Sequence, residues 1–160
     1  MLLRLLARLG LHVASEHTDT DAVKGGAVSA LRTVARVVLG LAMAGAGTAH
    51  LTVAREEFQA QVPDWFPLDD DLVVVGSGVV EIALGASFVA LPRRKRLVGG
   101  LLAAFFVAIF PGNVAQYLDG TDAFGLTTDR ARFVRLFFQP VLVAWALWAG
   151  GTLRKPDERD

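Results

Sequence analysis

The chain has 160 residues, of which 53% are apolar and 20% are charged, and it contains no cysteine. A soluble domain carries about a quarter charged residues, so this composition argues against a soluble enzyme. Without cysteine there is no disulfide, no thiol nucleophile and no cysteine-based zinc or iron–sulfur site. The net charge of zero supplies no basic surface for a phosphate backbone, so nucleic acid is not an expected partner.

The apolar residues gather in four stretches that are almost free of charge. Glu81 is the one charged residue within these stretches, which cover residues 37–54, 72–92, 97–118 and 136–153. Each is long enough to cross a hydrocarbon layer of about 30 Å, and none has a polar face at helical spacing. We therefore predict an all-α polytopic membrane protein, a bundle of four transmembrane helices, in preference to a soluble four-helix bundle.

The sequence predicts three further segments around these spans. Arg4, Arg8 and His12 recur every four residues among leucines, so residues 1–14 are expected to form a short amphipathic helix on the membrane surface. Residues 15–26 are polar and end in glycine, which predicts a linker. The transmembrane domain then occupies residues 27–153, and residues 154–160 form a tail.

Most basic residues fall on one side of the predicted spans. That side holds the N-terminal segment, the second connection and the tail, with Arg4, Arg8, Lys24, Arg32, Arg36, Arg93, Arg94, Lys95, Arg96, Arg154, Lys155 and Arg159. The positive-inside rule therefore predicts a multi-pass protein of the cell membrane with both termini in the cytoplasm. Membrane lipids are its first expected partners.

Strongly polar side chains interrupt each span. His50, Glu81, Asn113 and Gln139 come from four different spans, and a rise of 1.5 Å per residue places all four in the outer half of the membrane. A charge at mid-membrane costs about 2.5–3.5 kcal/mol on insertion scales, so such groups face the bundle and need partners. Their shared depth predicts one polar pocket, in which Glu81 and His50 are the candidate proton-handling groups.

Two arginines are predicted to approach this pocket. Arg135 lies one turn before Gln139 and, with Arg132, forms a cationic ramp from the outer surface. Arg36 lies on roughly the same helix face as His50, from which it would reach up toward Glu81. The sequence leaves open whether Glu81 pairs with His50, Arg36 or Arg135, or is protonated as a structural group. Hydrogen bonds between helices are the alternative role for the histidine and the amides.

Metal chemistry is poorly supplied. One histidine and one glutamate do not make a closed metal site, so no metal ligands are assigned. A haem with two histidine ligands inside the bundle is excluded, because His12 and His17 lie outside the spans. A haem with a single histidine ligand stays open, and the cofactor is otherwise undetermined.

Five motifs resemble the DoxX and DoxX-like family of small four-helix membrane proteins. Beside Arg36 they are Gly-Ala-Gly-Thr-Ala-His at 45–50, Val-Pro-Asp-Trp at 62–65, Gly-Ser-Gly-Val-Val-Glu-Ile at 76–82, Phe-Pro-Gly-Asn-Val-Ala at 110–115 and Arg-Leu-Phe-Phe-Gln-Pro at 135–140. They follow the family's order and spacing over residues 32–148. The resemblance implies a redox-associated membrane protein, since related proteins include a subunit of a thiosulfate:quinone oxidoreductase and proteins linked to methylamine-dehydrogenase maturation or oxidative-stress complexes. The lack of cysteine argues against a thiol relay here.

Two functions of different classes follow. The first is a redox-associated membrane subunit that binds a quinone or a similar lipophile, because an apolar cavity with an imidazole, a carboxyl and two amides suits a quinone headgroup. Its electrons would come from a partner oxidoreductase subunit, and whether the chain is itself an enzyme is left open. The second is a non-catalytic assembly factor or scaffold, in which the polar groups fix helix register. A third reading is a small transporter or lipid-handling protein, for which four helices are few unless the chain forms a homo-oligomer.

Overall fold

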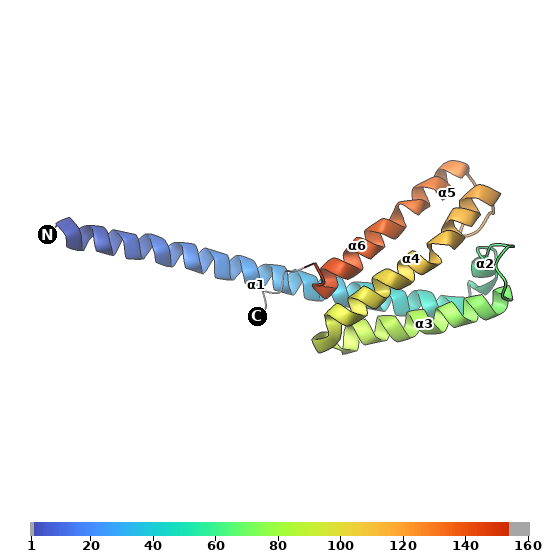
Figure 1. Ribbon diagram of the computed structural model, residues 1–160, viewed down its shortest axis with the longest axis horizontal. Helices are drawn as coiled ribbons and strands as arrows, with labels where there is room; N and C mark the ends of the chain where they lie inside the picture. The colour runs from blue at the N-terminus through green and yellow to red at the C-terminus, as the bar shows by residue number, and fades with distance from the viewer. Residues whose placement is uncertain (1, 154–160) are drawn as a thin grey trace. The chain divides into compact units, whose positions relative to one another are not determined.

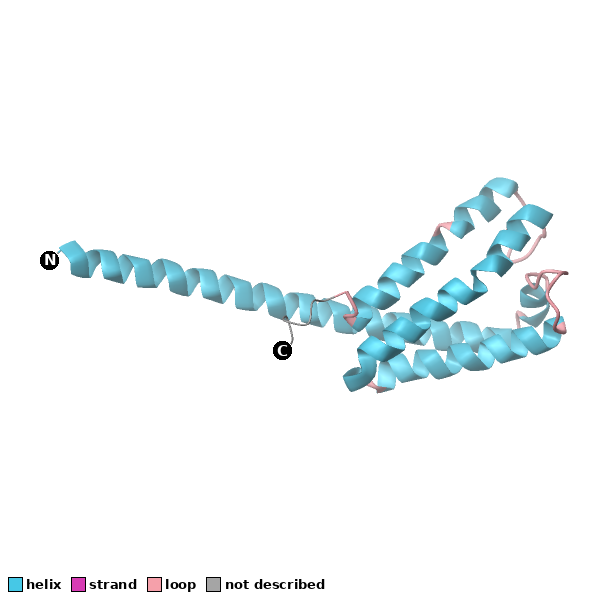
Figure 2. Cartoon of the chain, viewed as in Figure 1, coloured by secondary structure: helices cyan, strands magenta, loops and turns pink. Residues whose placement is uncertain are grey.

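The computed structural model describes the backbone of residues 2–153 and the side chains of residues 23 and 25–153. Within this part every regular element is helical (Figure 2). The predicted tail, 154–160, and the side chains of the predicted amphipathic segment, 1–14, lie outside it. The chain divides into two compact units, residues 1–34 and 35–160. The first unit is the N-terminal part of helix α1, and the apolar core and the buried polar groups lie in the second.

Four long helices and three short ones make up the described chain, as Figure 1 labels them. In order they are α1 (Leu2–Leu51), α2 (Arg55–Gln59), α3 (Asp70–Ala90), η1 (Pro92–Arg94), α4 (Lys95–Asp119), α5 (Asp129–Leu136) and α6 (Phe138–Gly150).

Four segments are long and apolar enough to cross a membrane, which confirms the predicted fold class. They are Gly25–Leu51, Asp70–Ala90, Pro92–Asp119 and Asp129–Gly150. The protein is therefore a multi-pass membrane protein of the all-α class. Large apolar side chains such as Leu41, Leu101 and Val141 are exposed on these segments, as contact with lipid tails requires.

The N-terminal part of the fold differs from the prediction in one respect. Helix α1 runs without a break through residues 15–26, where the sequence predicts a linker. The physical reason is that Gly25 and Gly26 each cost a helix only about 1 kcal/mol relative to alanine, and the neighbouring Ala and Lys residues favour helix. The boundary between the two compact units falls later, after Val34.

The helices begin and end where the local sequence supplies caps. Asp69 precedes α3 and its carboxylate accepts hydrogen bonds from the backbone N–H of Asp71 and Leu72, at 3.0 and 3.2 Å. Thr128 caps α5 in the same way by accepting from the N–H of Ala131. Gly120 ends α4 in a left-handed conformation (φ 68°) that glycine adopts without steric cost.

Two pairs of helices approach closely through glycine. Helix α1 meets α3 where Gly40 faces Gly85 and Gly47 faces Gly78, and helix α4 meets α6 where Gly99 lies against Ala146. A Cβ atom built at any of these glycines would lie within 3 Å of the neighbouring backbone. Small residues of this kind allow helix backbones to pack tightly within a membrane.

The apolar core lies toward the end of the bundle that carries η1, called here the η1 end. Leu39, Phe88, Leu102, Phe106 and Ala146 are almost completely buried there and join all four long helices. Trp145 of α6 donates a hydrogen bond from its indole Nε1 to the backbone carbonyl of α1 residue 35, at 3.1 Å. The opposite end, called the α2 end, holds α2 and the loop between α4 and α5, and it carries most of the buried polar groups.

Candidate functional site

Two of the predicted site residues form a buried pair between α1 and α3. His50 and Glu81 are each 4% exposed, and His50 Nδ1 lies 3.3 Å from Glu81 Oε2. Neither of these two atoms has another hydrogen-bond partner among the described residues. The pair exists because Gly47 and Gly78 let the two backbones approach, with the Cβ of His50 only 2.8 Å from where a Cβ of Gly78 would be.

Helix α2 covers this pair with an aromatic ring. The ring of Phe58 meets the imidazole of His50 edge to face, with the two planes at 89°. Two side chains fix α2 on α3, because Arg55 Nε and Gln59 Nε2 both donate to Oδ1 of Asp71, at 2.6 and 2.8 Å. The hydrogen bond that Arg55 donates to Asp71 and the negative charge of that carboxylate raise the pKa of Arg55.

The other two predicted residues form a second pair, between α4 and α6. Asn113 Nδ2 donates to Gln139 Oε1 at 3.1 Å, and Gln139 Nε2 donates to the carbonyl of Phe106 at 2.6 Å. Gln139 is buried, and Asn113 is partly so. These bonds join α4 to α6 on both sides of Pro111, a residue without a backbone N–H to donate within the helix.

A groove of about 700 Å³ opens beside the amide pair. Asn113 of α4, Arg130 and Arg135 of α5 and Gln139 of α6 supply its strongly polar groups. The rest of its wall is mostly apolar and includes Phe124, Leu126, Val134, Phe138 and Leu142. The volume lies in the range of about 300–1,000 Å³ that is usual for small-molecule sites.

Arg135 is the central cation of this groove. Its guanidinium lies over the ring of Phe124, 5.0 Å from the centroid, and Nη2 donates to Gln61 Oε1 at 3.2 Å. Gln61 in turn donates from Nε2 to Gln116 Oε1 at 2.7 Å. Among the described residues no carboxylate pairs with Arg135, although its side chain is half-buried on a membrane helix.

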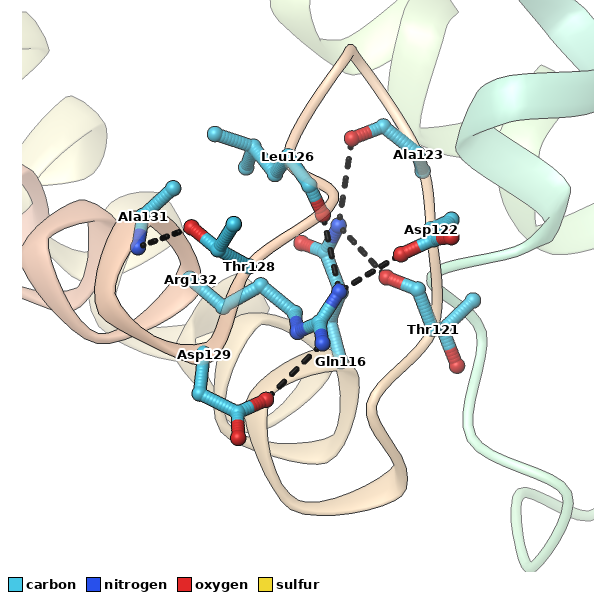
Figure 3. A network of polar contacts seen from close by, with 9 residues as sticks. All are labelled: Gln116, Thr121, Asp122, Ala123, Leu126, Thr128, Asp129, Ala131 and Arg132. Atoms are coloured by element: carbon cyan, nitrogen blue, oxygen red, sulfur yellow. Dashed lines mark hydrogen bonds and ion pairs between the residues drawn. The ribbon is translucent and has the colours of Figure 1, made fainter.

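The loop between α4 and α5 forms one wall of the groove and is held in place by two buried side chains (Figure 3). Arg132 donates to the carboxylates of Asp122 and Asp129, at 2.6 and 2.8 Å, and to the carbonyl of Leu126, at 2.8 Å. Gln116 donates from Nε2 to the carbonyls of residues 121 and 123, at 3.4 and 3.5 Å. The loop is therefore tied to both flanking helices.

Phe124, at the tip of this loop, separates the two polar pairs. Its ring lies 4.6 Å from that of Phe58, which contacts His50, and its other neighbour is Arg135 of the groove. Its backbone has a positive φ of 54°, which is unusual for a phenylalanine, and its N–H donates to the carboxylate of Glu57 at 2.8 Å. Phe58 and Phe124 thus form a continuous series of ring contacts from His50 to the groove wall.

The structure sorts the predicted residues as follows. His50 meets Glu81 and Asn113 meets Gln139, but the groove is lined by Asn113, Gln139 and Arg135 without the His50–Glu81 pair. The four residues therefore form two separate pairs, of which the amide pair lines the groove. The predicted shared depth of these residues in the membrane stays a prediction, and Glu81 itself lies near the middle of α3.

Two expectations about the arginines are corrected. The predicted approach of Arg36 to Glu81 is wrong, because Arg36 Nη1 donates to the carbonyls of Phe88 and Val89 at the end of α3. Those carbonyls lie about two turns beyond Glu81 and carry the negative end of the helix dipole, which attracts a cation. The prediction that Arg132 and Arg135 together form a cationic path inward is also corrected. Arg132 pairs with two acids of the loop, so Arg135 alone of the two arginines lacks a carboxylate partner among the described residues.

Several residues of the site were missed at the sequence level. Phe58, Gln61 and Phe124 lie in α2, its following turn and the α4–α5 loop, all outside the predicted spans. The loop carried a usable signal, because Asp129 and Arg132 are three residues apart and Phe124 precedes a glycine. Nothing in the sequence showed that two separate connections meet over His50.

Most of the chain matches one protein family. Residues 39–150 match the family described as Domain of unknown function (DUF8561). The chain belongs to that family. The DUF8561 segment contains both polar pairs, the groove and the two aromatic rings, and it begins after Arg36. No curated protein and no solved structure matches the chain.

Within the part of the DUF8561 chain that the structure describes, no three His, Asp or Glu side chains are grouped to hold a metal ion. The polar groups of the site can form hydrogen bonds and carry charge. The groove offers N–H donors from two guanidinium groups and two amides, and the buried pair offers one imidazole and one carboxyl.

Proposed function

We propose that the groove binds a membrane lipophile with a hydrogen-bond-accepting head, a quinone or a similar molecule, and that the protein is a redox-associated membrane subunit. The observation that supports this most directly is Arg135. A half-buried guanidinium without a carboxylate partner is costly inside a membrane protein, and an oxygen-rich head lowers that cost. The five N–H donors of an arginine exceed what Gln61 alone can use.

The groove fits a quinone in shape and in polarity. A quinone head has two carbonyl oxygens, for which Arg135 and the amide N–H groups of Asn113 and Gln139 are suitable donors. Phe138, Leu142 and Val134 give the isoprenoid part an apolar wall. When bound, a quinone supplies two-electron redox chemistry, with electrons from a partner oxidoreductase subunit. The motifs that resemble the DoxX family support the same redox association.

The proposal is tested by purifying the protein in mild detergent and extracting bound lipophiles. We expect a quinone-class lipophile near one per chain in the wild type, and at least a tenfold lower occupancy in Arg135→Gln. Arg94→Gln, an exposed arginine at the η1 end, is the matched control and should retain full occupancy. Equal occupancy in Arg135→Gln and wild type, or wild-type preparations without any lipophile, would overturn the proposal.

The hydrogen bonds of the amide pair favour a second candidate, the non-catalytic assembly factor or scaffold. Asn113, Gln139 and the carbonyl of Phe106 already satisfy one another without a ligand, as residues that fix helix register do. On this reading the same preparations are empty of lipophile, and Asn113→Ala lowers the stability of the protein and its yield in complex with a partner.

We further propose that the protein lies in the cell membrane with the η1 end and both termini in the cytoplasm. Four consecutive basic residues at 93–96 mark the η1 end, whereas the connections at the α2 end hold most of the acids, including Glu56, Glu57 and Asp122. The positive-inside rule supports this orientation. It places the groove and both polar pairs in the outer half of the membrane.

A further inference from the structure

We infer that His50 and Glu81 form a proton-binding site and together hold one proton more than an ionised carboxylate with a neutral imidazole. The inference begins with geometry. Two titratable groups face each other at 3.3 Å, both side chains are more than nine-tenths buried, and Nδ1 and Oε2 have no other hydrogen-bond partner among the described residues. One proton between Nδ1 and Oε2 satisfies both atoms, and a neutral imidazole can itself supply it, so the additional proton is argued from charge.

Charge balance supports the additional proton. Without the additional proton the pair would carry one negative charge between two membrane helices, and a lone buried charge is not tolerated without a partner. Among the described residues, the arginines on the elements around the pair are engaged elsewhere. Arg36 bonds to the end of α3, Arg55 to Asp71, and Arg132 to two loop acids. Arg135 lies beyond Phe124, and the nearby acid on α2, Glu57, accepts from the backbone of that residue.

The aromatic rings separate this proton from the groove. Phe58 packs on His50, Phe124 packs on Phe58, and Phe124 is part of the groove wall. The groove is lined by arginines and amides but, among the described residues, by no carboxyl or imidazole. The pair is therefore the buried acid–base group behind that wall, since Glu57, which also contacts Phe124, is exposed. This step rests on the proposed function: a lipophile reduced in the groove by two electrons from a partner takes up two protons, and the pair is one reservoir for them.

Infrared difference spectroscopy of the detergent-purified protein tests the bound proton without any ligand. A protonated pair shows either the C=O stretch of a carboxylic acid or the ring bands of an imidazolium. We expect one of these signals at neutral pH, sensitive to deuterium exchange, in the wild type and in Glu56→Gln, whose exposed carboxylate makes it the control. Glu81→Gln should lose the signal while keeping its helical circular dichroism. His50→Gln should keep a carboxylic acid signal from Glu81.

The failure of this inference is distinguishable from failure of the proposed function. If the wild type shows only ionised carboxylate bands and a neutral imidazole at neutral pH, the proton-binding site does not exist, whatever the groove binds. If the infrared signal is present but a short-chain ubiquinone analogue does not bind the wild type, the site stands and the quinone proposal falls.

The rate of deuterium exchange at the His50–Glu81 pair tests whether the aromatic rings separate it from the groove. Phe124→Ala should accelerate deuterium exchange at the His50–Glu81 pair at least tenfold, because it removes the ring between pair and groove. Phe133→Ala, an exposed ring on α5, should leave the exchange rate unchanged. Equal exchange rates in wild type and Phe124→Ala would overturn the role of Phe124 as the separating wall.

Discussion

Three described arginines of the bundle are stabilised in three different ways. Arg36 binds backbone carbonyls at the end of α3, where the helix dipole already favours a cation. Arg132 binds two carboxylates and a carbonyl, so its charge is fully compensated. Arg135 has one amide oxygen and the face of one ring, which compensate a cation only partly. This graded series is the reason that Arg135, and not the more buried Arg132, is assigned to ligand binding.

Arg132 should be the arginine on which the loop depends. Replacing it by glutamine removes the donors to Asp122, Leu126 and Asp129 at once and leaves the loop with the weaker bonds from Gln116. We expect Arg132→Gln to melt several degrees lower and to be cleaved by protease within residues 120–128. Arg130→Gln removes the same charge from an exposed position and is the control. Unchanged protease resistance in Arg132→Gln would show that the loop is held by other contacts.

At the scale of the elements, the contact between α1 and α3 depends on glycine. Gly47 and Gly78 approach so closely that an added Cβ at Gly47 would lie 2.8 Å from the Cβ of Glu81. The same contact sets the distance between His50 and Glu81. Gly45 and Gly76 lie on the same two helices but have nothing within 4 Å of an added Cβ.

This difference predicts opposite outcomes for neighbouring glycines. Gly47→Ala should destabilise the protein by about 1–3 kcal/mol, because the two helices must move apart to avoid a clash. Gly45→Ala should cost nothing, since its Cβ meets open space. Thermal unfolding in detergent measures both. If the two variants have the same melting temperature, the α1–α3 contact is less close than the structure shows.

At the scale of the whole molecule, the spans were predictable and the partition of the site was not. Length and apolar composition identify four membrane segments because the cost of burying charge in lipid acts on each helix separately. Depth along a helix follows from a fixed rise per residue, so the sequence alone allows a shared depth to be predicted for His50, Glu81, Asn113 and Gln139. The contacts among these four residues depend on the order of the helices in the bundle and on side chains such as Phe58 and Phe124 in the connections. The hydrophobic pattern of a single helix does not predict such contacts.

The orientation of the whole molecule gives the last prediction. Because the chain contains no cysteine, single cysteines can be introduced without a background. Val53, 92% exposed in the turn before α2, and Leu91, exposed before η1, lie at opposite ends of the bundle. If the η1 end is cytoplasmic, a membrane-impermeant maleimide should label Val53→Cys in intact cells, and Leu91→Cys only after permeabilisation. Neither change alters a charge, so the basic residues at 93–96 remain to set the orientation. The reverse labelling pattern would show that the α2 end is cytoplasmic, and the groove would then lie in the cytoplasmic half of the membrane.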